Sequence, residues 1–193
     1  MARPREFDER TVLDSLVQCF WSRGYEATSV RDLIEKTGLT GASLYNAFGD
    51  KHALYQCALD HYVEMSVAER IRRAEALDPR AAIANFFNDI VERSLNDADH
   101  KGCMLVNAAL EMAPHDPGFR EAVTVVLQRI EAFFLRSVAQ GQSDGSISPE
   151  IPAEDLSKNL LGVLMGIRVL ARVRPEPELL AGILRAALNQ LKP

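Results

Sequence analysis

The stretch from Thr28 to Lys51, TSVRDLIEKTGLTGASLYNAFGDK, decides the fold. Ser29 followed by Asp32 has the spacing of a capping box, which predicts a short helix that ends at Gly38. After a turn of three or four residues, a second short helix is predicted over residues 40–46. The apolar positions that would pack these helices on each other are Leu33, Ile34, Leu39, Leu44 and Phe48. The stretch therefore predicts a helix-turn-helix.

The second helix of this unit carries a small or hydrogen-bonding side chain at most of its remaining positions. These are Thr40, Gly41, Ala42, Ser43, Tyr45 and Asn46. The recognition helix of a helix-turn-helix enters the DNA major groove with its N-terminal part, where small and polar side chains approach the base edges. The pattern predicts a DNA-binding surface.

The same stretch resembles the DNA-binding domain of the TetR/AcrR family of bacterial regulators. The matching residues are Thr28, Leu33, Ile34, Gly38, Leu39, Thr40, Leu44, Tyr45, Phe48, Lys51 and Leu54, with Phe20, Gly24 and Tyr25 upstream. Three positions depart from the family pattern: Thr37 and Ala42 replace a common alanine and glycine, and Ala47 replaces an aromatic residue. These departures leave the operator sequence unreadable.

The resemblance implies a role for each residue of this surface. Thr28, Ser29 and the N–H groups after them lie at a helix start, which favours phosphate. Thr40, Ser43 and Tyr45 would donate hydrogen bonds to phosphate or sugar. Asn46 would read a base or position the helix, and Lys51 would add a positive charge. Gly41 and Ala42 would let the backbone approach, with the Ala42 methyl next to a thymine methyl. Arg3 and Arg5 would form an N-terminal arm, for which a solvated tail is the alternative.

The rest of the chain also has helical periodicity. Helices are predicted over about residues 7–23, from Asp50 onward, and over 78–95, 103–113, 116–140, 153–172 and 176–191, with a loop over 141–152. With the two short helices this makes about nine. We expect an all-α protein with a helix-turn-helix domain over residues 1–51 and a larger effector-binding and dimerisation domain over 52–193.

Composition gives no general preference for nucleic acid. The 193 residues carry a net charge of −5, and residues 1–51 hold seven basic and eight acidic side chains. DNA affinity must therefore come from placed donors and helix ends. Three separated cysteines, no signal-peptide pattern and no long apolar run predict a cytoplasmic protein without a membrane span.

A regulator of this resemblance would bind a small-molecule effector in its larger domain. Candidate pocket residues are Phe86, Met104, Asn107, Glu111, Phe134, Met165 and Arg168, for which ordinary core packing is the alternative. Glu111 lies in an otherwise apolar helix. It is expected to face solvent, to pair with Arg168 or to meet the ligand, because an unpaired buried carboxylate is unfavourable.

The last two helices have apolar stripes that predict a dimer interface. The stripe residues are Leu160, Leu164, Ile167, Ala171, Leu180, Ile183, Leu184, Ala187 and Leu188. Packing within one chain is the alternative. A two-fold dimer would present two recognition helices to a palindromic operator.

The sequence thus predicts a homodimeric, ligand-responsive transcriptional regulator, a repressor by family resemblance, that a small molecule releases from double-stranded DNA. Two alternatives stay open: a helical interaction module, and a regulator that senses electrophiles or oxidants through Cys103 at a helix start. No catalytic constellation, metal-ligand spacing or cofactor motif occurs.

Overall fold

The computed structural model describes residues 7–193, all of whose regular structure is helical. The elements are α1 (Glu9–Arg23), α2 (Val30–Thr37), α3 (Gly41–Phe48), α4 (Lys51–Tyr62), the π-helical segment η1 (Val63–Ala68), α5 (Glu69–Ala74), α6 (Pro79–Leu95), α7 (Met104–Glu111), α8 (Pro117–Asp144), α9 (Ala153–Val173) and α10 (Pro177–Asn189). Because α4, η1 and α5 follow one another without a break, the part of the chain described here holds nine continuous helical segments. The predicted all-α fold is confirmed.

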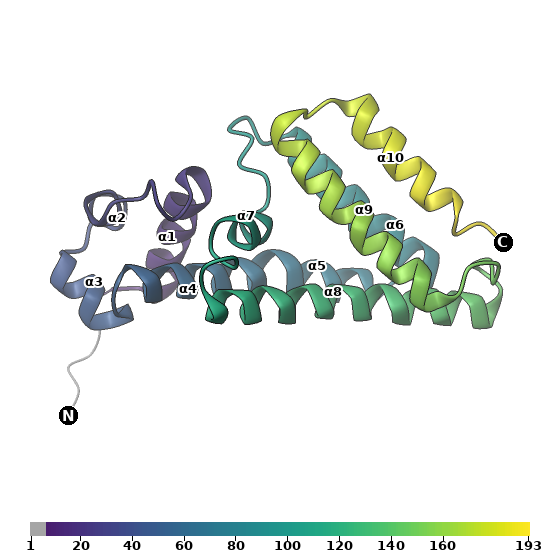
Figure 1. Cartoon of the computed structure of the whole chain (residues 1–193), viewed down its shortest axis with the longest axis horizontal. Coiled ribbons are helices and arrows are strands. Elements are labelled where there is room, and N and C mark those ends of the chain that lie inside the picture. Colours follow the sequence, from purple (N-terminus) through teal and green to yellow (C-terminus); the bar gives the residue numbers. More distant parts are fainter. Residues whose placement is uncertain (1–6) are drawn as a thin grey trace.

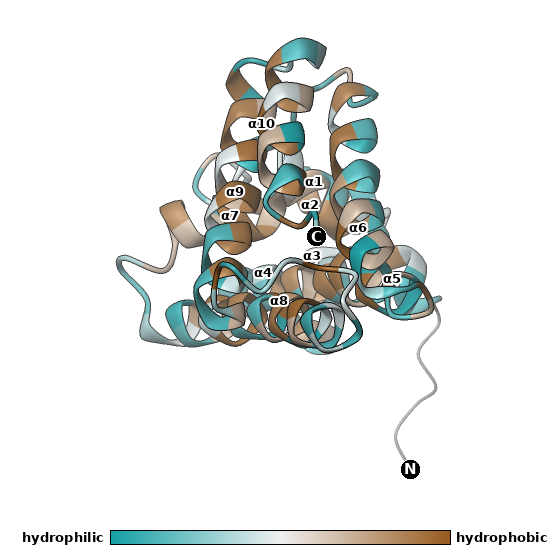
Figure 2. Ribbon diagram, turned by 90° about the vertical axis from the view of Figure 1, so that its right-hand side faces the viewer, coloured by the Kyte–Doolittle hydropathy of each residue, from teal (hydrophilic) through white to brown (hydrophobic). Residues whose placement is uncertain are grey.

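Two parts of the molecule are joined by this long helix (Figure 1). Helices α1, α2 and α3 form the N-terminal end, and α4 runs from it through η1 and α5 into the larger part. Seen end-on, α6, α9 and α10 stand above a layer that holds α4, α5 and α8 (Figure 2). The helix that starts at Lys51 therefore crosses the boundary expected between residues 51 and 52.

Aspartate side chains begin four of the helices. Asp8, Asp50, Asp78 and Asp116 each accept a hydrogen bond from a backbone N–H in the first turn of α1, α4, α6 and α8. In α6 and α8 the next residue is proline, whose missing N–H is not needed at that position. These local signals explain why the helix starts could be read from the sequence.

Four phenylalanines from α6 and α8 form the centre of the larger part. Phe86, Phe87, Phe133 and Phe134 are each at most 1% exposed, and their ring centroids lie 5.2 to 5.9 Å apart. Burial of aromatic rings at these distances combines loss of hydrated apolar surface with favourable ring contacts. This cluster holds the two helices together.

Helix α8 continues past the predicted end to Asp144, so the loop expected over residues 141–152 is shortened to residues 145–152. Gly141 lies inside α8 and is buried, and the helix ends at Gly145, whose φ is 80°. A Cβ on Gly141 would lie 2.5 Å from side-chain atoms of Ile147. The glycine is therefore explained by the close approach of the chain that folds back after α8, and not by a loop.

The predicted dimer stripe is also corrected, because most of it is core within one chain. Its members Leu160, Leu164, Ile167, Ala171, Leu180, Leu184 and Ala187 expose at most 6% of their surface, while Ile183 and Leu188 are half-buried. Helix α9 packs on α8 and α6, and α10 packs on α9 and α6. The stripe residues therefore pack within the chain.

Candidate DNA interface

Helices α2 and α3 form the predicted helix-turn-helix at the N-terminal end of the molecule (Figure 1). The Ser29 hydroxyl accepts from the Asp32 N–H at 3.2 Å, and Asp32 Oδ2 accepts from the Ser29 N–H at 2.8 Å. Gly38 ends α2 in the left-handed conformation, with φ at 70°. The predicted capping box and helix end are confirmed, and they fix the turn that leads into α3.

Helix α3 exposes the face that a recognition helix needs. Ala42, Tyr45 and Asn46 are exposed, and Tyr45 keeps 40% of its surface open. Leu44, on the opposite side, is fully buried. The side of α3 that faces away from Leu44 is therefore free to approach base edges and phosphates.

The start of α3 is held by its own hydroxyl groups. Thr40 is the N-cap, and its oxygen accepts from the Ser43 N–H at 3.1 Å. The two hydroxyl oxygens of Thr40 and Ser43 lie 2.9 Å apart. At Gly41 a Cβ would lie 3.2 Å from Ile34 Cδ1. This glycine therefore permits close packing of α3 on α2, which is a different role from the backbone approach to DNA that we expected.

The start of α2 offers DNA its backbone N–H donors and one cation, but the Thr28 side chain cannot contact DNA. Thr28 is fully buried and its hydroxyl donates to the Gly24 carbonyl at 2.6 Å. The DNA contact predicted for the Thr28 side chain is therefore wrong, and this side chain has a structural role. Ser29, in contrast, is exposed. Sequence reasoning missed Arg31, which is exposed in the first turn of α2 and has no ion pair within residues 7–193.

Lys51 is the first residue of α4, which follows α3 in the chain. Its Nζ is 4.4 Å from the centroid of the Tyr25 ring, so the aromatic face holds the ammonium group in place. The side chain is half-buried. Arg3 and Arg5, predicted as an arm, lie outside the described residues.

The acidic residues of this end are largely occupied in structural contacts. Asp32 forms an ion pair with Arg23, and hydrogen bonds from Ser29 and then from Arg23 lower its pKa to about 2. Asp8 and Asp50 are N-caps, and Asp14 pairs with His61 at 2.7 Å. These contacts hold the carboxylates within the protein without removing their charge, so DNA binding must still rest on placed donors, helix ends and a few cations.

Glu111, at the end of α7, anchors the helix-turn-helix to the larger part. Its Oε1 accepts from the Glu26 N–H at 2.8 Å, and its Oε2 accepts from the Tyr25 N–H at 3.1 Å. A Cβ on Gly24, whose φ is 82°, would lie 2.9 Å from Oε2. Glu111 thus binds the backbone of the α1–α2 turn, a partner that was not among the three we expected.

The other predicted pocket residues fall into two groups. The first group lines neither of the two cavities described below and consists of Phe134, Met104 and Asn107. Phe134 and Met104 are core side chains, and the Asn107 amide oxygen accepts from Arg172 at 2.5 Å. Phe86, Met165 and Arg168 line a small cavity of about 10 Å³. Arg168 alone of the predicted set also lines a larger cavity, of about 220 Å³.

The larger cavity lies between α1 and the helices of the larger part. Trp21 of α1, Met65 of η1, Arg70 of α5 and Arg168 of α9 are among its lining residues. Sequence reasoning did not find it because its walls come from segments more than 140 residues apart. Within residues 7–193, no group of three or more metal-ligating side chains is present, and no helix is long and apolar enough to cross a membrane.

Comparison with known proteins gives matches for both parts of the chain. A family model described as "Bacterial regulatory proteins, tetR family" matches residues 12–57, and one described as "Tetracyclin repressor-like, C-terminal domain" matches residues 79–187. The chain is 28% identical over 172 residues to the HTH-type transcriptional repressor ComR of Escherichia coli strain K12, covering 88% of this chain and 82% of ComR. It is 30% identical over 151 residues to the regulator YezE of Bacillus subtilis strain 168, covering 78% of each chain.

A solved structure agrees over nearly the whole length. A cysteine mutant of the TetR family regulator CifR, complexed with 26-base-pair operator DNA, superposes with a TM-score of 0.85 at 31% identity. The match covers 97% of this chain and 98% of that one. A TetR regulator from Chloroflexus aurantiacus superposes with a TM-score of 0.81 at 25% identity, covering 92% and 90%.

Proposed function

Because the chain belongs to the TetR family of bacterial regulatory proteins, we propose that it is a homodimeric transcriptional repressor that binds operator DNA through α3 and is released by a small molecule. The observation that carries the proposal is the exposed face of α3, formed by Ala42, Tyr45 and Asn46 at the end of a capped helix-turn-helix. The family is one of regulators and not of enzymes.

The proposed DNA contacts divide into two kinds. Tyr45 and Asn46 on α3 would meet the major groove, with Ala42 next to a thymine methyl. The Ser29 end of α2, Arg31 and Lys51 would bind phosphate, because a helix start and fixed cations both favour anions. These contacts would compensate for the lack of a net positive charge.

The dimer interface is proposed on the open face of α9, and not on the stripe predicted from the sequence. Gly162 and Gly166 are exposed, and a Cβ at either would have no neighbour within 4 Å. Val169 and Val173 continue the same helix with 43% and 67% of their surface exposed. A partner helix would approach closely over the glycines and bury both valines.

Operator binding tests the first part of the proposal. Fluorescence anisotropy with the DNA upstream of the protein's own gene should give tight binding that weakens as salt rises, because bound phosphates release counterions. Lys51→Ala should lower the slope of log affinity against log salt by about one, and Tyr45→Ala should weaken binding without lowering the melting temperature. Arg129→Ala, which removes an exposed cation of α8, is the control.

Two outcomes would contradict this part. If both Tyr45→Ala and Lys51→Ala bind the operator as tightly as the wild type, the assigned surface is wrong. Salt-insensitive binding, or no binding to any DNA, would favour a helical interaction module instead.

Light scattering after size exclusion tests the dimer. The wild type should have about twice the mass of one chain. Val169→Glu would place a charge in the proposed interface and should shift the protein towards monomer, whereas Val125→Glu, at an exposed valine of α8, should not. A wild-type monomer would contradict the dimer, and a dimeric Val169→Glu would contradict the assigned face.

Redox sensing through Cys103 has weaker support. Cys103 is 5% exposed, and the Tyr62 hydroxyl donates to its sulfur at 3.5 Å. Burial of this kind protects a thiol from reagents in solution. Release of operator DNA by an electrophile from the wild type but not from Cys103→Ser would establish this second mechanism.

A further inference from the structure

The cavity of about 220 Å³ lies between the DNA-binding end and the larger part of the molecule. Helix α1 contributes Asp14, Val17 and Trp21 to its lining, and α9 contributes Arg168 and Ala171. The charges of this cavity are unbalanced, and this imbalance indicates what it binds.

Arg168 is a buried cation with no counter-ion in the described part of the chain. The residue is 8% exposed and faces both cavities, and no carboxylate within residues 7–193 lies within ion-pair distance of it. Its guanidinium group also acts on Arg70, whose pKa is lowered by burial and then by the charge of Arg168. A buried charge without a counter-ion is strongly unfavourable, so a ligand that supplies a negative charge would be favoured.

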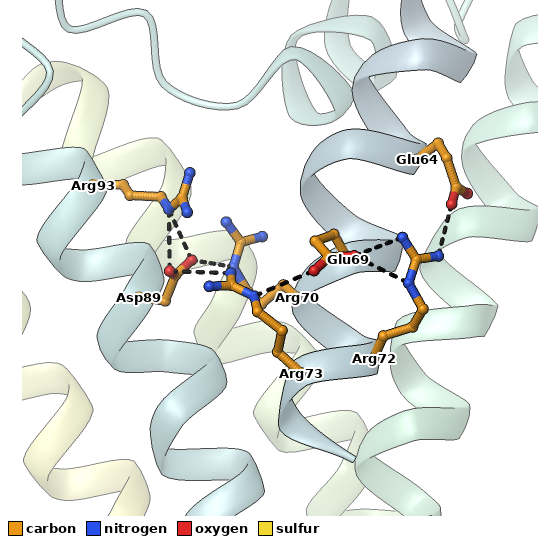
Figure 3. Close-up of polar contacts among 7 residues, drawn as sticks. All are labelled: Glu64, Glu69, Arg70, Arg72, Arg73, Asp89 and Arg93. Atoms are coloured by element: carbon orange, nitrogen blue, oxygen red, sulfur yellow. Dashed lines mark hydrogen bonds and ion pairs between the residues drawn. The ribbon is translucent and has the colours of Figure 1, made fainter. Parts of the chain in front are cut away.

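The counter-ion of Arg70 is already shared with two other arginines. The Arg70 Nε donates to Asp89 at 2.7 Å, but Arg73 and Arg93 bind the same carboxylate at 3.3 and 3.1 Å (Figure 3). The Asp89 carboxylate is therefore shared by three guanidinium groups, of which Arg73 also lies 3.9 Å from Glu69. Arg70 and Arg93 both line the cavity. The cluster adds positive charge at this wall.

The acidic groups of the lining have partners of their own. Asp14 binds His61 at 2.7 Å, and Asp97 binds Lys101 at 3.0 Å. Burial raises the pKa of the Tyr62 phenol, which therefore remains neutral and donates to Cys103. None of these groups compensates for Arg168.

Trp21 provides a second indication. Its indole Nε1 is buried and has no hydrogen-bond acceptor among the residues that the structure describes, and its side chain lines the cavity. An indole N–H is only a donor, so it calls for an acceptor on the ligand. The ring of Trp21, with Val17, Met65 and Ala171, supplies apolar surface in the same space.

From these observations we propose that the effector is a small organic carboxylate with an apolar body, bound in this cavity with its carboxylate on Arg168. This inference rests on the proposed function, because it names the class of molecule that would release the repressor. A carboxylate supplies the negative charge that Arg168 lacks, and a guanidinium is the side chain best suited to bind a carboxylate through two hydrogen bonds.

Binding here would act directly on the DNA-binding end. The ligand would touch α1, which supports the helix-turn-helix, and η1, where π-helical geometry interrupts the long helix. π-helical turns are frequent at functional sites. A molecule that prefers one position of α1 relative to α9 would shift the population between two orientations of the recognition helices.

Trp21 is the sole tryptophan of the chain, so its fluorescence reports occupancy without DNA. We would titrate the dimer with benzoate, phenylacetate, cinnamate and hexanoate, each beside its neutral amide. At least one carboxylate should change the emission and bind about thirtyfold or more tightly than its amide, because the amide lacks the charge. Benzoate and phenyl phosphate would be compared to separate a carboxylate from a phosphate.

Two variants locate the site. Arg168→Gln should lose carboxylate binding by about thirtyfold or more, and Arg168→Lys should retain part of it. Ala171→Leu keeps Arg168 but fills the cavity, and should also lose binding. Arg129→Gln, which removes an exposed arginine of α8 outside the lining, should bind like the wild type.

The proposal is overturned if no carboxylate changes Trp21 emission, if amide or phosphate binds as tightly, or if folded Arg168→Gln and Ala171→Leu both bind like the wild type. Operator binding is measured separately. Intact operator binding with no response of Trp21 overturns the effector class and leaves the repressor. A carboxylate that binds through Arg168 but leaves the operator complex unchanged supports the site and contradicts release.

Discussion

Replacing Glu111 by glutamine should weaken the attachment of the helix-turn-helix to the larger part. The carboxylate accepts two backbone hydrogen bonds, from Glu26 at 2.8 Å and from Tyr25 at 3.1 Å. A glutamine keeps one carbonyl oxygen, and its NH₂ group would face the other N–H donor. The substitution preserves shape, so the effect reports these two hydrogen bonds and the charge.

The size of the effect follows from the hydrogen bonds lost. A hydrogen bond to a charged group contributes about 1.5–3 kcal/mol, and the exposed side of this site reduces that value. We therefore expect a loss of about 1–2 kcal/mol in unfolding free energy. If this loss falls on the orientation that binds DNA, operator affinity should fall by about tenfold, since 1.4 kcal/mol corresponds to a factor of ten.

Two measurements check the prediction. Urea unfolding gives the free energy, and amide hydrogen exchange should show faster exchange at Tyr25 and Glu26, whose N–H groups lose their acceptors. Glu121→Gln, which removes the same charge from an exposed position of α8, should change neither. Unchanged exchange at both amides in Glu111→Gln, with unfolding free energy equal to that of the control, would refute the anchoring role.

Two further substitutions test the local structure. Because Ser29 hydrogen bonds hold the pKa of Asp32 at about 2, below its usual value of 3.8, the carboxylate stabilises the fold above pH 4, and this contribution disappears as pH falls through 2. Asp32→Asn should therefore melt at a lower temperature than the wild type at neutral pH and approach it near pH 2; a constant difference in melting temperature across this range would contradict the prediction. Gly141→Ala would place a methyl group 2.5 Å from Ile147, and should lower the unfolding free energy by about 1–3 kcal/mol in urea despite the better helix propensity of alanine. A stabilised Gly141→Ala would mean that Ile147 moves aside easily.

The sequence by itself determined those features that depend on neighbours along the chain. Ser29 and Asp32 cap α2 within one turn, Gly38 ends it, and the Asp-Pro pairs at 78–79 and 116–117 begin α6 and α8. Such signals act over three or four residues, and they were sufficient for the helix-turn-helix and the all-α fold. The exposed face of α3 followed from the same helical spacing.

The tertiary structure decided which side chains meet across the chain. Glu111 binds a turn 85 residues earlier, and the stripe of α9 and α10 is covered by α8, α6 and each other. An apolar stripe has the same period whether a partner subunit or the same chain covers it, so periodicity could not assign it. The sequence could not predict the uncompensated charge of Arg168 either. That no carboxylate of residues 7–193 pairs with it depends on every helix that surrounds the cavity.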